Sequence, residues 1–270
     1  MLIFYFMLKE HVIHWWVRDR VGLFLTETEK FHFNYLNKFN EKDIFDKITV
    51  CMAVDNVSDE LLDYLKNEFM SSICRDDINF VVYKNDSSSG EFYTYKTYVL
   101  SRLNDDAYLF YSHFKGARRE GREPRFSEEK VWCANLYQGC YDMMFVENNL
   151  PNVPMVGAHL EQKGIFWFDK WLWTGNRFMY ESKNPCFKTL YKTSGGIYLD
   201  GSFHWVNTIK MREYLKNKGV DSSEIMIDFD IPMRRTHLSE YYLCSLMDEK
   251  SCIAKYSGVL TIRDNIKINN

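Results

Sequence analysis

The residues best suited to chemistry stand at the end of one apolar run, in residues 108–116 (YLFYSHFKG). Strand-forming residues are followed there by His113, Lys115 and Gly116. Lysine neutralises anions, histidine donates or accepts a proton, and glycine lets backbone amides approach a ligand closely. Phosphate is the ligand that this combination suits best. A strand followed by a basic surface loop explains the same residues equally well.

Polar pairs follow two other apolar runs of the chain. Asp55 and Asn56 end the first of them, and Asn85 and Asp86 come just after the second. Carboxylate and amide groups at these places are predicted ligands for the uracil or ribose of a nucleotide. Cap and turn residues of the same types are the alternative interpretation.

A candidate for proton transfer stands later in the chain. Asp200 comes just before a predicted helix that Ser202 would cap, and a carboxylate there could take the proton from an acceptor hydroxyl. An ordinary turn residue in an Asp-Gly pair is the alternative. Phe203, His204 and Trp205 are predicted acceptor contacts, although Trp205 suits a core position just as well.

Alternating strands and helices position these residues. The runs at 2–8, 48–54, 78–83 and 108–111 are predicted strands, and the segments 12–37, 59–70 and 91–103 between them are predicted helices, with Ser58 as an N-cap. This alternation is typical of an α/β fold with a mostly parallel sheet and flanking helices. The polar strand ends then converge on one crevice, where such sheets bind ligands.

The second half of the chain is less regular. A helix is predicted over 131–144, a strand over 155–158, a strand and then the Ser202-capped helix within 197–218, and a helix over 238–247. Residues 164–182 are rich in aromatic side chains without a clear period. Residues 117–130 are a charged run that reads as a solvated loop; a flap that closes over phosphate is the alternative, and its candidate arginines are Arg118, Arg119, Arg122 and Arg125.

Composition limits the classes of function. The 270 residues carry a formal net charge of −3 with a pI near 6.2, which argues against general affinity for nucleic acid. Aromatic residues make up 17% of the chain, a surplus that suits clefts for sugars because ring faces pack on the C–H side of pyranose or furanose rings. Seven cysteines without a Cys-x-x-Cys pair indicate reduced thiols.

Targeting signals are not evident in the sequence. The apolar N-terminus MLIFYFML lacks a basic region and is short, so it is predicted to be a strand rather than a signal peptide. No stretch reaches the roughly 18 apolar residues that a membrane-spanning helix needs. We therefore expect a cytoplasmic protein. Peripheral association with a membrane surface is compatible with this location.

Several segments stand in a recognisable order along the chain. They are residues 111–116 (YSHFKG), Trp132, residues 156–157 (VG), residues 201–205 (GSFHW) and Glu240. Their order and spacing, over roughly residues 2–250, resemble a family of bacterial glycosyltransferases from capsule and O-antigen loci. That family has Tyr-x-His-Thr-Lys-Gly, a tryptophan-containing helix, Val-Gly, Gly-Asn-Phe-Trp-Trp and a helix bearing Glu. Phe114, Ser202 and His204 depart from the pattern, which would make this chain a divergent member.

The resemblance implies a GT-A-like single domain over residues 1–270, with a nucleotide-sugar-binding half (1–116) and an acceptor-binding and catalytic half (117–270). It implies transfer of a sugar from a nucleoside-diphosphate donor, UDP-galactofuranose being one that it permits, to a growing surface polysaccharide. The acceptor it implies is a polyprenyl-linked oligosaccharide at the inner face of the cytoplasmic membrane. Glu240 becomes a rival to Asp200 as the base, and His113, Lys115 and Gly116 would bind the donor diphosphate.

The chain lacks a carboxylate pair where many such transferases hold Mg²⁺ or Mn²⁺, at the end of the fourth strand. Ser112, His113 and Lys115 occupy that place and form no site for a hard cation. Residues 228–230 (DFD) fall too late, and residues 105–106 (DD) precede the strand. We predict a metal-independent, inverting transfer, in which lysine neutralises the leaving diphosphate; use of Mn²⁺ or Mg²⁺, and a retaining reaction, are the alternatives.

Two other functions fit the same sequence. A non-catalytic subunit of a polysaccharide-assembly complex, binding nucleotide or glycan, would also lack the metal-binding pair. A phosphate-handling enzyme of another class rests only on the His-Lys-Gly strand end. Turnover of a nucleotide sugar separates the transferase from both.

Overall fold

The computed structural model of the chain describes most of residues 7–162 and shorter stretches beyond them. The described residues are 7–39, 41–85, 91–115, 117, 119–162, 165–168, 171–174, 177–181, 197–199, 202–222, 225, 243, 246–248 and 250–257. No helix within these ranges combines the length and the hydropathy that crossing a membrane requires.

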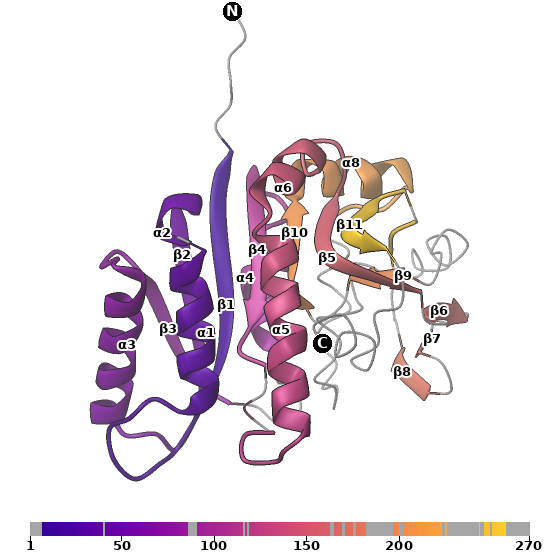
Figure 1. The fold of residues 1–270 in the computed structure, drawn as a ribbon. Coiled ribbons are helices and arrows are strands. Elements are labelled where there is room, and N and C mark those ends of the chain that lie inside the picture. Colours follow the sequence, from indigo (N-terminus) through magenta and orange to yellow (C-terminus); the bar gives the residue numbers. More distant parts are fainter. Residues whose placement is uncertain are drawn as a thin grey trace, which may run out of the picture.

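A sheet of eight strands forms the centre of the fold, with the order β11-β5-β10-β4-β1-β2-β3 and with β9 paired to β5 (Figure 1). The bounds of these strands are β1 Leu8–Arg18, β2 Lys47–Asp55, β3 Asn79–Lys84, β4 Ala107–His113, β5 Met155–Gln162, β9 Ile197–Leu199, β10 His204–Asn207 and β11 Cys252–Ser257. All run parallel except β9 and β10, which are antiparallel to their neighbours. Strands from both halves of the chain therefore share one sheet.

Helices cover both faces of this sheet (Figure 1). One face, which we name the α1 face, carries α1 (Glu27–Lys38), α3 (Asp59–Ile73), α5 (Arg125–Cys140) and α6 (Met143–Asn149); the other, the α4 face, carries α4 (Phe92–Tyr98), the 3₁₀ helix η1 (Leu100–Arg102) and α8 (Thr208–Asn217). The short α2 (Glu41–Ile44) leads into β2. The predicted α/β class, a mostly parallel sheet with flanking helices, is confirmed.

Local sequence signals explain why the first elements begin where they do. Thr26 and Glu29 form a capping box at the start of α1. Ser58 caps α3 through its side chain, as predicted, by accepting from the backbone N–H of Leu61 at 3.3 Å. Strands β2, β3 and β4 lie where the apolar runs predicted them.

The first strand is displaced from its predicted position. The sequence predicts a strand at 2–8 and helices over 12–37, but β1 spans Leu8–Arg18 and the helix begins only at Glu27. The reason is burial on both faces: Val12, Ile13, Trp15 and Val17 are all fully buried or nearly so. A strand covered on both sides loses the alternation that distinguishes it from a helix.

One further prediction for the second half is corrected. Ser202 does not cap a helix; β10 follows it, and Asn207 caps α8 by accepting from the backbone N–H of Lys210 at 3.1 Å. Within the aromatic stretch, for which the sequence predicts no element, the described residues form a separate three-stranded antiparallel sheet, made of β6 (Ile165–Phe168), β7 (Trp171–Thr174) and β8 (Arg177–Glu181). The helix predicted over 238–247 lies largely outside the described residues.

The charged run at 117–130 divides into a turn-rich segment and the first residues of α5, which begins at Arg125.

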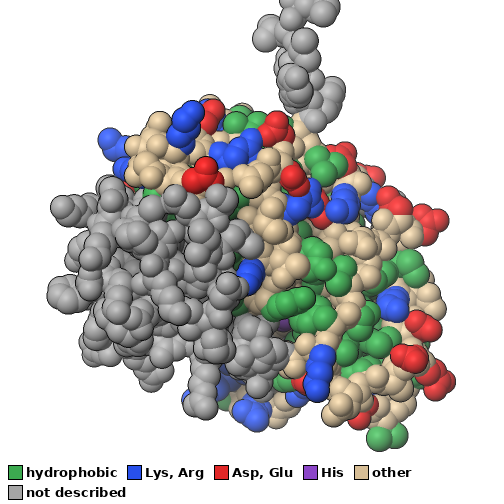
Figure 2. Space-filling view, turned by 180° about the vertical axis from the view of Figure 1, so that it is seen from behind, with side chains coloured by type: hydrophobic (Ala, Val, Ile, Leu, Met, Phe, Trp, Pro, Cys, Tyr) green, Lys and Arg blue, Asp and Glu red, His purple; other side chains and the backbone are tan. Residues whose placement is uncertain are grey.

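The view from behind shows apolar side chains gathered among charged ones on part of the surface (Figure 2). Val82 on β3 and Tyr93 on α4 are among the exposed apolar side chains, at 40% and 42%.

Candidate functional site

The carboxyl ends of β1 and β4 meet where the direction of strand connection reverses. From β1 the chain passes through α1 to β2 and then to β3 on one side, whereas α4 brings it back to β4 on the other side of β1. In open α/β sheets, ligands bind in the crevice at such a switch point. The ends of β1 and β4 are therefore the expected location of a ligand site.

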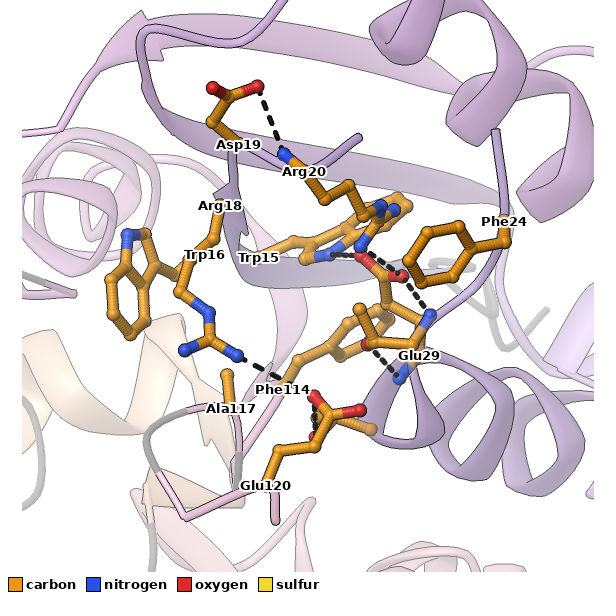
Figure 3. Close-up of a pocket in the computed structure, with 12 residues that line it drawn as sticks. Trp15, Trp16, Arg18, Asp19, Arg20, Phe24, Glu29, Phe114, Ala117 and Glu120 are labelled. Atoms are coloured by element: carbon orange, nitrogen blue, oxygen red, sulfur yellow. Dashed lines mark hydrogen bonds and ion pairs between the residues drawn. The ribbon is translucent and has the colours of Figure 1, made fainter. Parts of the chain in front are cut away.

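A cavity of about 280 Å³ lies at this switch point (Figure 3). Its walls come from the end of β1, the segment leading into α1 and the segment after β4. The lining residues are Trp15, Trp16, Arg18, Asp19, Arg20, Phe24, Thr26, Thr28, Glu29, Phe114, Ala117 and Glu120. We call this space the switch-point cavity.

Arg20 is the most unusual group in the switch-point cavity. Its Nη1 lies 2.9 Å from Oε2 of Glu29, whose Oε1 accepts a hydrogen bond from the Trp15 indole at 3.2 Å (Figure 3). Only 9% of the Arg20 side chain is exposed. Its Nε and Nη2 are buried and have no hydrogen-bond partner among the described residues. Buried guanidinium donors left unsatisfied are costly, and an anionic ligand would satisfy them.

The opposite wall of the cavity is tied to α1 by Glu120. This carboxylate accepts from the backbone N–H of Glu27 at 2.6 Å and from the Thr28 hydroxyl at 3.3 Å. Nη2 of Arg18 lies 3.6 Å from Oε2 of Glu120. The Arg18 guanidinium also lies 5.4 Å from the centre of the Trp16 ring. The charges of the wall are thus held in place before any ligand arrives.

The predicted nucleotide ligand Asp55 lies beside this cavity. Its Oδ2 accepts from the Trp16 indole at 2.8 Å and from the Asn85 amide at 2.9 Å, so the ends of β1, β2 and β3 meet at one carboxylate. Asn56, next in the chain, adopts a left-handed conformation with φ of 52°. The structure thus brings together Asp55 and Asn85, whereas Asp86 lies outside the described residues.

His113, at the end of β4, pairs through Nδ1 with the carboxylate of Glu91, just before α4. The other oxygen of Glu91 accepts from the Ser202 hydroxyl at 2.9 Å. We call these three residues the Glu91–His113–Ser202 cluster. No sequence signal pointed to Glu91, because it follows a polar Ser/Gly-rich run and resembles any acidic residue at a helix start.

His14 lies beside this cluster, opposite His113 in the register of β1 and β4. Its Nδ1 is 3.0 Å from the Thr94 hydroxyl and 3.2 Å from that of Tyr83. Burial lowers the pKa of His14 from 6.5 to about 4; the Glu91 carboxylate opposes this shift and His113 adds to it. His14 is therefore neutral at physiological pH.

Lys115 turns toward α5. Its Nζ lies 4.3 Å from the centre of the Trp132 ring, a cation–π distance, and its backbone carbonyl is 2.9 Å from Nε2 of His32. Its side chain does not line the switch-point cavity. The role of Lys115 at a diphosphate remains a prediction, and Gly116 lies outside the described residues.

The three predicted acceptor contacts lie in the core. Phe203 and Trp205 are fully buried and His204 is 1% exposed. The Trp205 ring stacks on Phe45 and Phe110, and its indole donates to the backbone carbonyl of Cys140 at 2.9 Å. Their burial favours the core role for Trp205, and a role of these three residues in acceptor binding stays a prediction.

Both predicted bases, Asp200 and Glu240, lie outside the described residues, as do residues 228–230. Within the part of the chain that the structure describes, no three metal-ligating side chains come together. A wider depression of about 710 Å³ lies near Asn104 and α8, at the amino-terminal edge of β4 and away from the carboxyl ends of the strands.

Sequence reasoning missed Arg18 and Arg20 because it placed the first strand too early. Read as the end of a buried strand HVIHWWV, the following RDR would have marked a charged strand end like those at Asp55 and His113. The charged residues at the end of β1 were thus visible in the sequence, but the wrong position of the first predicted strand concealed their role as a strand end.

The similarity of this chain to known proteins is distant. No family model and no curated protein matches it. Among solved structures it is similar to 4-diphosphocytidyl-2C-methyl-D-erythritol synthase from Anaerococcus prevotii, with 8% identity and a TM-score of 0.40 over 97% of this chain and 95% of that one. A likeness at this level carries no conclusion about activity.

Proposed function

We propose that the chain is a glycosyltransferase that takes a sugar from a nucleoside-diphosphate donor, with UDP-galactofuranose as one candidate, and adds it to a growing surface polysaccharide. The observation that carries the proposal is the switch-point cavity, whose buried Arg20 has unused donors at the ligand-binding edge of a parallel sheet. His113 of the segment that resembles the family pattern ends β4 at this edge, which supports the proposal.

The groups around the cavity suit the parts of a nucleotide. The guanidiniums of Arg20 and Arg18, which both line the cavity, would face the diphosphate. Trp16 offers an aromatic surface, and Asp55 beside it can accept hydrogen bonds from base or ribose. At about 280 Å³ the cavity is at the small end for ligand pockets, so the sugar would extend beyond it along the sheet edge.

Two arginines at the end of β1 support metal-independent transfer as part of this proposal, since cationic side chains can stabilise a leaving diphosphate without a metal ion. Use of Mn²⁺ or Mg²⁺ is the alternative, which binding measurements with and without EDTA distinguish. The proposed acceptor is an oligosaccharide that is linked to a polyprenyl lipid at the inner face of the cytoplasmic membrane.

The apolar loop beside the cavity supports that placement at a membrane. Val21, Leu23 and Phe24 are 98%, 47% and 48% exposed directly after β1. Exposed apolar side chains on a loop that directly follows two arginines suit the interface of a lipid surface. An acceptor held in the membrane would then lie near the donor.

The test measures both binding and turnover. Thermal stabilisation by UDP, GDP, CMP and UMP is recorded with EDTA or Mn²⁺ for wild type, Arg20→Gln, Lys115→Ala and, as a control remote from the edge, Lys66→Gln. At a hundredfold excess over Kd, a nucleotide should add about 2.7 kcal/mol of stability. We expect one nucleoside diphosphate to stabilise wild type and Lys66→Gln in EDTA, and Arg20→Gln much less.

Turnover then separates the candidate functions. Release of the nucleoside diphosphate from the matching nucleotide sugar supports the transferase. Binding without release in the presence of oligosaccharide acceptors would instead identify a non-catalytic binding subunit. No stabilisation by any nucleotide would overturn the donor site altogether.

A further inference from the structure

The Glu91–His113–Ser202 cluster is built so that a carboxylate holds one imidazole nitrogen of His113, while the other nitrogen has no hydrogen-bond partner among the described residues. Glu91 accepts from Nδ1 of His113, and Ser202 donates to the second oxygen of the same carboxylate at 2.9 Å. The Nε2 of His113 has no hydrogen-bond partner among the described residues. Nε2 itself is buried, whereas the His113 side chain as a whole keeps 11% of its surface exposed, so the cluster lies just beneath the surface.

This arrangement fixes the tautomer of His113. A neutral imidazole carries one proton, and a carboxylate at Nδ1 holds that proton on Nδ1. The lone pair is then on Nε2, which becomes the basic nitrogen. A carboxylate in this position also stabilises the imidazolium that forms once Nε2 takes a proton.

The cluster also destabilises the fold, because it buries a carboxylate and holds a serine in an unfavourable backbone conformation. A purely structural role would need neither. Glu91 is a buried carboxylate, with 8% of its side chain exposed. Ser202 holds its hydroxyl on Glu91 from a left-handed backbone conformation with φ of 57°, which is unfavourable for a residue other than glycine. The Tyr111 hydroxyl, 3.3 Å from the backbone carbonyl of Glu91, fixes that residue further. Such costs concentrate at functional sites.

We infer that His113 is the general base of the transfer reaction, that Glu91 orients it, and that Ser202 positions Glu91. The inference rests on the proposed function and assigns it a proton acceptor within the described residues, in place of Asp200 or Glu240. It also changes the role of His113 from a donor-binding to a catalytic residue.

In the transfer step, the acceptor hydroxyl gives its proton to Nε2 of His113 while its oxygen bonds to the anomeric carbon of the donor sugar. The bond from that carbon to the β-phosphate oxygen breaks, and its electron pair leaves with the nucleoside diphosphate. The imidazolium, paired with Glu91, then returns its proton to solvent.

The first test needs no substrate. Nitrogen-15 NMR of the histidine side chains at neutral pH, with His113 assigned by the signals missing in His113→Asn, reports which ring nitrogen carries the proton. We expect the neutral form of the His113 ring to carry its proton on Nδ1 and its lone pair on Nε2. A proton on Nε2 of the neutral ring would overturn the inference whatever the activity of the protein.

The second test separates catalysis from binding. In His113→Asn the amide can still donate to Glu91, but no basic nitrogen remains. With the nucleotide sugar that wild type turns over, kcat should fall by about a hundredfold or more, because general-base catalysis contributes that much. The donor KM should stay within about threefold of wild type, since uniform binding is not removed. Unchanged kcat, or a loss confined to donor affinity, contradicts the base assignment.

Two further variants keep the inference falsifiable. Adding imidazole should restore part of the activity of His113→Ala, which a purely structural loss would not allow. Glu91→Gln should lower kcat by about tenfold or more while the fold persists, because the orienting charge is gone. If wild type transfers sugar and these variants do so equally well, the base assignment alone fails; if wild type transfers none, the proposed function fails with it.

Discussion

Two histidines near the same edge of the sheet contrast sharply in what surrounds them. His32 on α1 is fully buried, with Nδ1 2.8 Å from the Tyr137 hydroxyl, Nε2 2.9 Å from the carbonyl of Lys115, and its ring stacked on Phe114 at 4.6 Å. His113 has a partner for Nδ1 and, in the described chain, none for Nε2.

The difference teaches how to separate structural from functional polar groups. Every hydrogen-bonding group of the His32 ring is used, so the residue completes the packing between α1, α5 and the segment after β4. The His113 ring, like the guanidinium of Arg20, retains hydrogen-bonding capacity that the described chain does not use. Buried polar groups are normally satisfied, so the exceptions indicate where a ligand acts.

The largest expected effect falls on the satisfied histidine. His32→Ala removes a buried ring and leaves the Tyr137 hydroxyl and the Lys115 carbonyl without it, which should lower the free energy of unfolding by about 3 kcal/mol or more. Urea unfolding measures this, with the partly buried neighbour Phe31→Ala as the control. If His32→Ala were as stable as wild type while losing nucleotide binding, the contrast between the two histidines would be reversed.

Acid should weaken the fold through the same residue and through His14. Burial lowers the pKa of His32 to about 3 and that of His14 to about 4, so both stay neutral in the native state while the unfolded chain takes up protons below pH 6.5. Stability is therefore complete above pH 6.5 and declines as pH falls from there. Each group contributes about 1.4 kcal/mol per pH unit.

Urea unfolding between about pH 6.5 and 5.5 checks this decline, because carboxyl groups titrate mostly at lower pH. His14→Asn should remove its share of the slope. A stability that stays constant over the window would show that these histidines are not held neutral by the fold.

The smallest expected effect distinguishes the two networks through their hydroxyl partners. Tyr137→Phe should cost about 1 kcal/mol of stability by removing one hydrogen bond to His32, with no change in turnover per folded molecule. Ser202→Ala should lower kcat several-fold, as its hydroxyl positions Glu91. Unfolding and turnover are measured on both variants. Equal effects on turnover would contradict the distinction between a structural His32 network and a functional His113 network.

The sequence predicted the parts of the fold that carry local signals. Strands β2, β3 and β4 are short apolar runs bounded by polar residues, and Ser58 is a cap that needs only its own helix. Strand β1 was misplaced because burial on both faces removes its period, and Trp15 and Val17 look no different from helical residues. The order of strands beyond β4, where β10 inserts antiparallel beside it, depends on long-range pairing that no local pattern encodes.

In the candidate site, too, only the residues with a local sequence signal were predictable. Asp55 and His113 follow apolar runs and could be found from that alone. Glu91 and Ser202 are far from His113 in sequence, and only the packing of α4 and β10 against β4 brings their side chains together. Arg20 needed the correct end of β1. Residue types suggested anion chemistry, but the arrangement that serves it had to come from the fold.

A crystal structure of the protein with UDP, grown in EDTA, would test the central claim most directly. The account predicts diphosphate oxygens within hydrogen-bond distance of Nε and Nη2 of Arg20, with the uridine beside Trp16 and Asp55. A nucleotide bound elsewhere, for example in the depression beside α8, would contradict the assignment of the switch-point cavity as the donor site.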